Sequence, residues 1–548
     1  MSRAPTAAGA LVDALREHGV DRVFCVAGES YLSVLDALHD TPGIDVVTCR
    51  HEGSAAYLAL ADAKLTGRAG VCLVSRAPGA ANACVGVHAA AESGVPLVVL
   101  VGAVSNGRTE QDSFQGLDPV RLFAAVTKAG WTVRTPDTAA PLVHRALRTA
   151  ESGTPGPVVL ALPQDVLAQP VAPTPVRPDP QQAAAASPAD VEQAGQLLAR
   201  ARRPLLVAGA GLDSAVGRGL LREFAERHGV PVVTSNKHPH LLPNRHPHYA
   251  GQLSDAGSPG QLAELGQADL VLAVGTRLDW VTSRGRSFPP GPPERQPLVH
   301  VHPGAAPVPA VRRPTVGAAC DPADFLRLLL PTEPAPWQER SAWTDRLHTA
   351  EVRRAAWRPT EAPDGVVFGA VVTALDELTG GDATVAVDSG AFTSWVLRHF
   401  RFGPRGRLLG LGSGSMGFGV PAGVAAALRG DGTVPTVVVT GDGGFLMNGT
   451  ELVTACARRL PLLVLVANNN SYGSIHLHQQ RLHPGRSVGT ALSNPDFAKL
   501  ADSFGALGLV LDRQEQAGTV LARALDHPGP VLVDIRTSLR HARAPLPT

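Results

Sequence analysis

The chain has 548 residues, more than one hydrophobic core usually supports, so we expect about three domains. Its 49 basic residues nearly balance its 48 acidic ones, and no basic block occurs. The sequence therefore lacks the electrostatic footprint of a nucleic-acid-binding protein, and a small-molecule function is favoured.

No segment of the chain has the pattern of a membrane span or of a secretion signal. The longest strongly apolar run, residues 95–104, has about half the length of a span and is typical of a buried strand. The N-terminal residues have the apolar spacing of an amphipathic helix, without the continuous apolar core of a signal peptide. We expect a cytoplasmic protein with no membrane partner.

Two proline-rich segments, residues 168–190 and 331–337, predict linkers between three parts of the chain. In each part, short β-branched and aliphatic runs alternate with helical patterns. This alternation predicts an α/β protein with three doubly wound parallel sheets, in domains at 1–170, 188–331 and 350–548. Ligands of such sheets bind at the carboxyl ends of the strands.

In the first part, a predicted strand ends in Arg50-His51-Glu52, and a helical pattern follows. A carboxylate at the start of a helix is stabilised by the helix dipole, so Glu52 could have a structural role alone. In the middle part, residues 208–215 read AGAGLDSA, with Ser214 where a dinucleotide-binding motif has its third glycine. This imperfect motif favours a tight strand-to-helix turn.

In the third part, a predicted strand runs into GDGG at 441–444, and a helix is expected near 448, with Asn448 and Glu451 at the spacing of a capping pair. The next strand ends in three asparagines at 468–470. One crossover separates the strands, so the Asp442 carboxylate and an asparagine amide should meet at one sheet edge. Such oxygen ligands suit Mg²⁺, although both segments could also be ordinary turns.

A glycine-rich stretch, GLGSGSMGFGVP at 410–421, contains the bulky Met416 among small residues. Glycines of this kind allow the backbone to approach a ligand closely. The stretch is therefore a candidate binding loop, and the role of its methionine needs an explanation.

The GDG motif followed by the asparagine pair resembles the signature of thiamine-diphosphate enzymes, and the rest of the chain resembles their acetolactate synthase group. The resemblance implies a pyrimidine-binding first domain, a middle domain and a diphosphate-binding third domain. It implies a metal site formed by Asp442, Asn469 and the carbonyl of Ser471, with thiamine diphosphate and Mg²⁺ as cofactors. The other implied cofactor contacts near this site are Gly441, Gly443, Gly444, Tyr472 and Gly473.

The same resemblance gives roles to three further segments. The Glu52 carboxylate would hydrogen-bond the aminopyrimidine ring of the cofactor, and Met416 would press between its two rings beside the backbone of Gly414. The VAGES loop places Gly28 near the reactive carbon. Phe114 and Gln115 match a motif that faces cofactor and substrate, with Gln115 as a catalytic candidate, although a surface loop remains an alternative.

The resemblance implies decarboxylation of a 2-oxo acid and transfer of the remaining unit to a second carbonyl compound. Two departures indicate an altered acceptor pocket. His478 stands near the position of a tryptophan of acetolactate synthases, and residues 276–285, TRLDWVTSRG, break the segment that carries their substrate-binding arginine. His476 or His478 could line the pocket, and Ile475 is a further candidate. A non-ligating decarboxylase, an acyl transferase and an inactive homologue remain alternatives.

Two more expectations follow from the resemblance. FAD binding is possible but doubtful, because histidines at 300 and 302 stand where acetolactate synthases have acidic residues. The family's site lies between the first domain of one subunit and the third domain of another, so we expect a homodimer or homotetramer.

Overall fold

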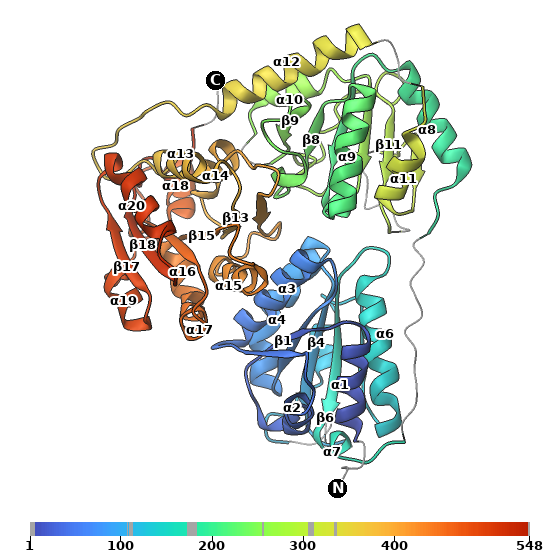
Figure 1. The fold of residues 1–548 in the computed structure, drawn as a ribbon, viewed down its shortest axis with the longest axis vertical. Helices are drawn as coiled ribbons and strands as arrows, with labels where there is room; N and C mark the ends of the chain where they lie inside the picture. The colour runs from blue at the N-terminus through green and yellow to red at the C-terminus, as the bar shows by residue number, and fades with distance from the viewer. Residues whose placement is uncertain are drawn as a thin grey trace.

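The computed structural model describes residues 6–106, 108, 113–172, 184–254, 257–304, 312–333 and 337–545. Three six-stranded sheets form the molecule, and the strands paired within them run parallel (Figure 1). Helices cover both faces of the sheets, as the alternating apolar runs predict. The predicted α/β architecture of three doubly wound sheets is confirmed.

The first sheet has the strand order β2-β1-β3-β4-β6-β5. Its strands are β1 Arg22–Cys25, β2 Asp45–Thr48, β3 Gly70–Val74, β4 Leu97–Ala103, β5 Ala129–Thr132 and β6 Pro157–Pro163. Its helices are α1 Ala7–Glu17, α2 Leu32–His39, α3 Glu52–Thr66, α4 Ala77–Ser93, α5 Pro119–Phe123, α6 Ala139–Glu151 and α7 Gln164–Leu167. Alternate residues of β4 enter different apolar clusters, Leu97 and Val99 on one face and Val98 and Leu100 on the other, so this strand is buried on both sides.

The middle sheet has the order β12-β11-β10-β7-β8-β9, the arrangement of dinucleotide-binding folds. Its strands are β7 Pro204–Ala208, β8 Val232–Thr234, β9 Tyr249–Gln252, β10 Leu270–Val274, β11 Leu298–Val301 and β12 Val316–Ala318. Its helices are α8 Pro188–Arg200, α9 Ala215–His228, α10 Pro259–Leu265 and α11 Pro322–Leu329.

The third sheet has the order β14-β13-β15-β16-β18-β17. Its strands are β13 Thr384–Val387, β14 Arg407–Leu409, β15 Thr436–Gly441, β16 Leu463–Asn468, β17 Leu507–Leu511 and β18 Val531–Arg536. Its helices are α13 Phe368–Thr379, α14 Thr393–His399, α15 Gly419–Arg429, α16 Asp442–Asn448, α17 Leu452–Ala457, α18 Gly473–Leu482, α19 Phe497–Phe504 and α20 Ala517–Leu525. When the strands of each sheet are numbered along the chain from its first strand, the first and third sheets have the same strand order.

The long helix α12, Trp337–Ala355, follows the second proline-rich segment and packs on the middle sheet. Trp343 and Leu347 belong to the same apolar cluster as strand residues of β7 and β10. The buried guanidinium of Arg340 donates hydrogen bonds to the carbonyls of Ala201 and His228, at the C-terminal ends of α8 and α9. A cation at these ends stabilises the helices and fixes α12 to the middle domain.

The first and third sheets meet through α3 and α15, which lie against each other (Figure 1). Both helices are rich in alanine and glycine, so their backbones can approach closely. The ring of Tyr57 meets that of Phe418 edge to face, with centroids 5.6 Å apart. The guanidinium of Arg429 on α15 pairs with Asp62 on α3 and with Asp21, each at 2.7 Å, which adds fixed charge pairs to the apolar contact.

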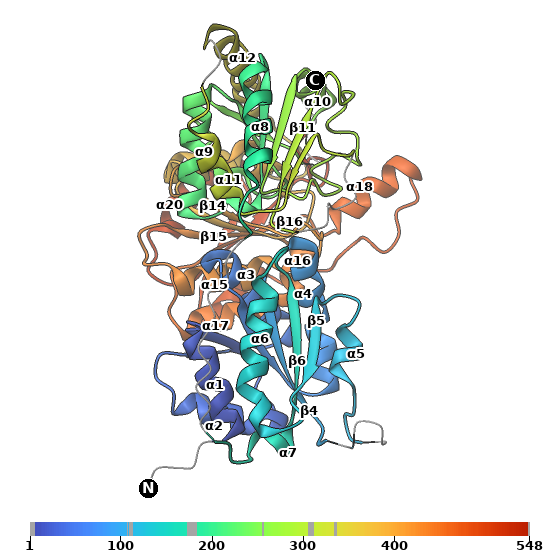
Figure 2. The ribbon, with the colours of Figure 1, turned by 90° about the vertical axis from the view of Figure 1, so that its right-hand side faces the viewer.

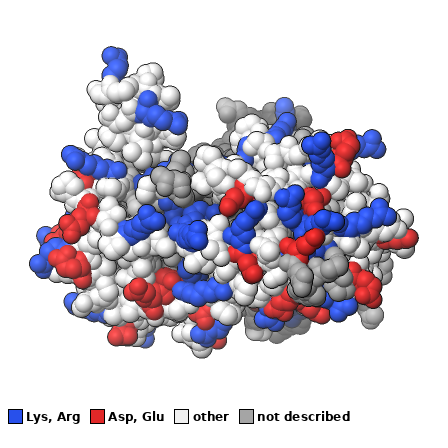
Figure 3. All heavy atoms as spheres, turned by 90° about the horizontal axis from the view of Figure 1, so that it is seen from above, with Lys and Arg blue, Asp and Glu red and all other residues white. Residues whose placement is uncertain are grey.

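Charged side chains of both signs lie on the one face of the molecule that Figure 3 shows. Basic and acidic side chains are interspersed there. No helix within the described part of the chain combines the length and apolarity needed to cross a bilayer.

Candidate functional site

A cavity of about 520 Å³ lies at the carboxyl ends of the strands of the third sheet. Its walls come from the loops after β13, β14, β15 and β16, from α18 and from the segment near the end of β18. Asn236, Lys237 and Val281 of the middle domain complete the wall. The cavity thus lies where ligands of parallel sheets bind.

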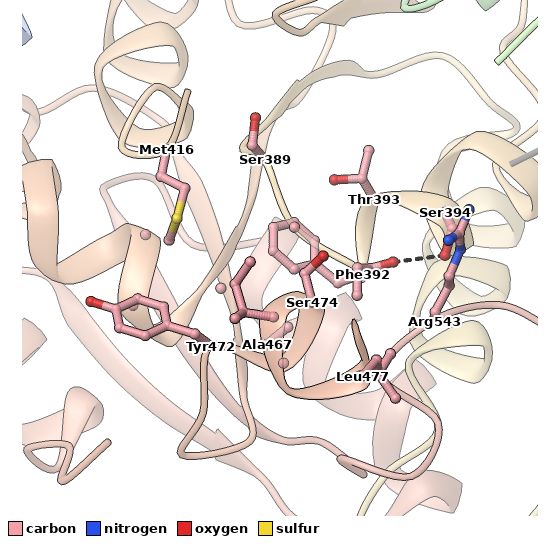
Figure 4. Close-up of a pocket in the computed structure, with 18 of the residues that line it drawn as sticks. Ser389, Phe392, Thr393, Ser394, Met416, Ala467, Tyr472, Ser474, Leu477 and Arg543 are labelled. Carbon is pink, nitrogen blue, oxygen red and sulfur yellow. Dashed lines mark hydrogen bonds between the residues drawn. The ribbon is translucent and has the colours of Figure 1, made fainter. Parts of the chain in front are cut away.

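The loop after β14 carries Met416 into this cavity, and Figure 4 shows its side chain extending toward the side of Tyr472. Gly414 and Gly417 have φ angles of 74° and 83°, which glycine adopts without strain. The amide of Gly417 donates to Asp388 Oδ2 at 3.0 Å, and its carbonyl accepts from Asn448 Nδ2 at 3.0 Å. These hydrogen bonds fix the two peptide groups that flank Gly417, and so hold the neighbouring methionine in place.

Asp388, at the end of β13, is a positioning residue that sequence reasoning missed. Its carboxylate also accepts from the amide of Ser389 at 2.7 Å and from Thr440 Oγ1 at 3.1 Å. Burial raises the pKa of this carboxyl group, while these hydrogen bonds oppose the rise. The acidic residue at the end of the apolar run TVAV was the available signal.

Asp442 begins α16 at the end of β15 and is 3% exposed. Its Oδ1 accepts from the amide of Gly443 at 2.9 Å, and its Oδ2 accepts from the amide of Ser471 at 3.2 Å and from Asn494 Nδ2 at 2.8 Å. Burial raises the pKa of Asp442, and the hydrogen bonds lower it. The carboxylate is therefore fixed in orientation next to the loop that follows β16.

That loop contains the three asparagines. Asn468 is structural, because its Nδ2 donates to Asp534 Oδ1 at 2.9 Å and its Oδ1 accepts from Asn494 Nδ2 at 3.0 Å. The side-chain oxygen of Asn469, by contrast, is buried and has no hydrogen-bond partner. A buried amide oxygen without a partner is costly unless a ligand satisfies it.

The oxygens of Asp442, Asn469 and Ser471 fit a divalent metal ion such as Mg²⁺, which takes one or two carboxylates and completes its shell with water and phosphate oxygens. All three residues line the cavity. Among the described residues, no cluster of three or more His, Cys, Asp or Glu side chains could hold a metal ion. The donor set at this place is instead one carboxylate with amide and carbonyl oxygens, which is the chemistry of a magnesium site.

The predicted capping pair of Asn448 and Glu451 is wrong. Helix α16 begins at Asp442, directly after the strand. A 3-10 helix, Gly449–Glu451, does begin near 448 with Asn448 in the N-cap position, but the Asn448 side chain makes no capping hydrogen bond. Asn448 instead holds the Met416 loop, and the buried carboxylate of Glu451 accepts from the amide of Arg50 in the first domain at 2.7 Å. Both polar side chains serve tertiary contacts, which local spacing does not reveal.

The first-domain candidates form a separate group. Glu52 begins α3, and its Oε2 accepts from Asn82 Nδ2 at 2.9 Å. A Cβ atom at Gly79 would lie 3.2 Å from Glu52 Oε1, and one at Gly28 would lie 2.6 Å from Ser75. The described residues that line the cavity include neither Glu52 nor Gly28.

Phe114 and Gln115 also lie away from the cavity within one chain. Phe114 is 80% exposed, and Gln115 has a φ angle of 56° in an exposed turn. Thr109–Asp112, just before this motif, fall outside the described residues. A cofactor-facing role for both side chains stays a prediction.

Helix α18 projects from the body of the third domain (Figure 2) and presents one face to the cavity. Ser474, Leu477, His478 and Arg481, at helical spacing, line the cavity from this face, as does Ile475. The described lining does not include His476. Of the two histidines considered from the sequence, His478 is therefore the one at the pocket.

Two glycine-containing loops meet at the switch point of the middle sheet, the place where a dinucleotide would bind in this fold. Between β7 and β10, the amide of Gly211 donates to the carbonyl of Gly275 at 2.9 Å, and a Cβ at Gly209 would lie 2.5 Å from that oxygen. His300 Nε2 lies 2.8 Å from the carbonyl oxygen of Thr276, at the end of β10. The glycines of these two loops thus pack closely against each other, and we derive no role for FAD.

Comparison with known proteins places three family matches along the chain. Residues 5–122 match the N-terminal TPP binding domain of thiamine pyrophosphate enzymes, residues 191–329 the central domain, and residues 388–535 the C-terminal TPP binding domain.

Curated relatives match over nearly the whole length. An acetolactate synthase large subunit of Parasynechococcus marenigrum is 33% identical over 96% of this chain and 87% of its own. The acetolactate synthase isozyme 2 large subunit of Escherichia coli is 32% identical over 96% and 94%. A putative thiamine pyrophosphate-containing protein of Bacillus subtilis, YdaP, is 30% identical over 97% and 91%.

Proposed function

The chain belongs to the thiamine pyrophosphate enzyme family, and from this premise we propose that it is an acetolactate synthase-like carboligase. It would decarboxylate a 2-oxo acid and transfer the remaining unit to a second carbonyl compound. The observation that carries the proposal is the cradle of Asp442, Asn469 and Ser471 beside the Met416 loop, with its buried amide oxygen left for a ligand.

In this proposal, the third domain holds Mg²⁺ and the diphosphate of the cofactor. Asp442, Asn469 Oδ1 and the carbonyl of Ser471 bind the ion. A Cβ at Gly443 would lie 2.5 Å from the Tyr472 ring, so a glycine is needed there. Without a side chain, the backbone of Gly443 could close on the diphosphate. Asn494 and the amide of Ser471 keep the Asp442 carboxylate oriented without a reorganisation cost when the ion binds.

Met416 and its loop would determine the shape in which the cofactor is held. The thioether is unbranched and soft, so it can fill the space between two rings. The backbone carbonyl of Met416 accepts a hydrogen bond from Tyr57 Oη at 3.3 Å, which links this loop to the first domain. When bound, thiamine diphosphate supplies a carbon nucleophile and an electron sink for the loss of CO₂.

Glu52 would act on the aminopyrimidine by holding and moving a proton at its carboxylate oxygen. Asn82 keeps one oxygen of that carboxylate in place, and the other lies over the small residue Gly79. A positioned carboxylate of this kind contributes about 10²- to 10⁴-fold to a rate by general acid-base catalysis. A chain that only bound the cofactor would have no chemical use for this proton carrier, which argues against an inactive homologue.

Glu52 does not line the cavity of its own chain, so we propose that a second copy of the chain completes the site. The first domain of one copy would face the third domain of the other, in a homodimer or a homotetramer. A closed two-fold assembly then contains two equivalent sites.

The proposal is tested by incubating the purified protein with thiamine diphosphate, Mg²⁺ and a panel of 2-oxo acids and aldehydes. Mass spectrometry of CO₂ and ligated products distinguishes the possible reactions. Hydroxyketone or hydroxy acid products support the carboligase, and aldehyde without a ligated product identifies a simple decarboxylase instead. Failure to bind thiamine diphosphate in the presence of Mg²⁺ would overturn the proposal.

A further inference from the structure

The cavity contains cationic side chains in addition to the residues proposed to hold a metal ion and a diphosphate. Lys237, Arg481 and Arg543 line it, with His478 and His541 beside them. Asp442 is the only acidic side chain among the described residues of its lining. Its carboxylate already has a role at the metal cradle.

The cofactor does not account for these cations. Its positive thiazolium ring and the bound divalent ion together balance the diphosphate, so this assembly brings little net charge into the cavity. Figure 4 shows Met416 and Tyr472 on one side of the cavity and Arg543 on the other, near Ser394. Arg543 thus lies across the cavity from the residues that would hold the cofactor rings.

The three cations come from three different segments. Arg481 lies on the face of α18 that lines the cavity, one turn after His478, whose Nδ1 lies 3.4 Å from the guanidinium. Arg543 follows the end of the third sheet. Lys237 enters from the middle domain with a φ angle of 64°, a conformation that costs free energy for a residue with a Cβ. Cations from separate segments thus meet at one cavity, where their combined field favours an anionic occupant.

The segment that usually receives the acceptor has a different role in this chain. Asp279 accepts from the amides of Val281 and Thr282, each at 2.9 Å, so it forms a turn and does not face the cavity. From this loop, the apolar Val281 lines the cavity. Among the described residues, no charged side chain of 276–285 lines the cavity, so the cations of the wall come from other segments.

We infer that this enzyme acts on a substrate that carries a second anionic group, a carboxylate or phosphate several bonds from the reacting carbonyl. Lys237, Arg481 and Arg543 are its specificity-determining residues. The inference rests on the proposed function, because it concerns the substrate class of the same reaction. Charge-assisted hydrogen bonds from such side chains would discriminate by about 10- to 100-fold against a neutral analogue.

The test compares matched substrates on the cofactor-loaded protein. As donors, 2-oxoglutarate and 2-oxopentanoate differ in a distal carboxylate against a methyl group. As acceptors, succinate semialdehyde is compared with butanal, and glyceraldehyde 3-phosphate with glyceraldehyde, which distinguishes carboxylate from phosphate. We expect kcat/KM to favour one anionic member by at least about 10-fold, and this preference to fall as ionic strength rises.

The variants Arg481→Gln, Arg543→Gln and Lys237→Met should reduce that preference toward unity, while lysine at either arginine position should restore part of it. Arg486→Gln, an exposed cation outside the described lining, is the matched control and should leave the preference unchanged. Thermal unfolding and thiamine diphosphate affinity are measured for each variant.

Three results separate the possible failures. Loss of cofactor affinity in the variants with no change in substrate preference would assign the cations to the diphosphate and overturn the inference. Equal kcat/KM for all matched pairs would also overturn it, while turnover of those substrates would leave the carboligase proposal intact. Absence of turnover with every 2-oxo acid would instead contradict the proposed function.

Discussion

The first and third sheets have the same strand order, yet their carboxyl edges carry different groups. In this correspondence β2 matches β14, so Glu52 at the start of α3 corresponds to the Met416 loop before α15. The matching helices α3 and α15 pack against each other. The shared topology fixes where loops emerge, and the chemistry depends on the residues placed in them.

The two edges also differ in how firmly their carboxylates are held. Asp442 is 3% exposed and accepts hydrogen bonds from Gly443, Ser471 and Asn494. Glu52 is only partly buried, and Asn82 supplies its one side-chain hydrogen bond among the described contacts. This difference fits the proposed roles, because a metal ligand needs fixed geometry and a group that moves a proton must be able to exchange it.

The largest effect is expected from Glu52→Gln. Removing the proton carrier while keeping the shape should lower kcat by about 10²- to 10⁴-fold. Affinity for thiamine diphosphate, measured by calorimetry, should change little, because glutamine can still hydrogen-bond. Glu92→Gln, an exposed substitution in the same domain, is the control. Wild-type turnover in the Glu52 variant would show that Glu52 only stabilises the start of its helix.

Asp442→Ala should act on binding before chemistry. Loss of the only carboxylate in the proposed metal site should weaken Mg²⁺-dependent cofactor binding by at least about 100-fold. Removing only a hydrogen-bond partner of a metal ligand already lowers metal affinity by about 10- to 100-fold. Calorimetry at several Mg²⁺ concentrations measures the affinity for the cofactor. Asp431→Ala, in an exposed turn of the same domain, should behave as wild type. Unchanged Mg²⁺ dependence in Asp442→Ala would mean that the ion binds elsewhere.

The sequence predicted the fold well because apolar alternation over three long segments reports burial directly. It also led to Asp442 and Asn469, which the structure places on one cavity, because parallel strands joined by one crossover end at the same edge. It did not reveal Asn494, which lies in a loop without periodicity and reaches Asp442 only through the tertiary fold. Asn448 and Glu451 misled for the same reason, since their partners lie in distant segments.

Asn494→Ala should give a smaller effect that shows the importance of orientation. Its Nδ2 touches Asp442 and Asn468, so its loss should lower Mg²⁺ affinity by about 10-fold while leaving the ligands in place. Asn82→Ala is the matched control from the other edge, because it frees the Glu52 carboxylate. It should lower kcat and spare Mg²⁺ affinity. If both variants changed the same parameter, the assignment of metal binding to one edge and proton transfer to the other would be wrong.

The smallest signal comes from mixing the two inactive chains, and it tests whether the edges cooperate between copies. In a mixed dimer of Glu52→Gln and Asp442→Ala, one site receives both defects and the other receives an intact Glu52 and an intact Asp442. Random exchange of equal amounts should then restore about a quarter of wild-type activity, because half of the dimers are mixed and each has one working site. Mixing each variant with itself controls for simple dilution, and size-exclusion chromatography verifies that Asp442→Ala still assembles. Exchange of subunits without recovered activity would place Glu52 at the site of its own chain, since every site would then carry one of the two defects.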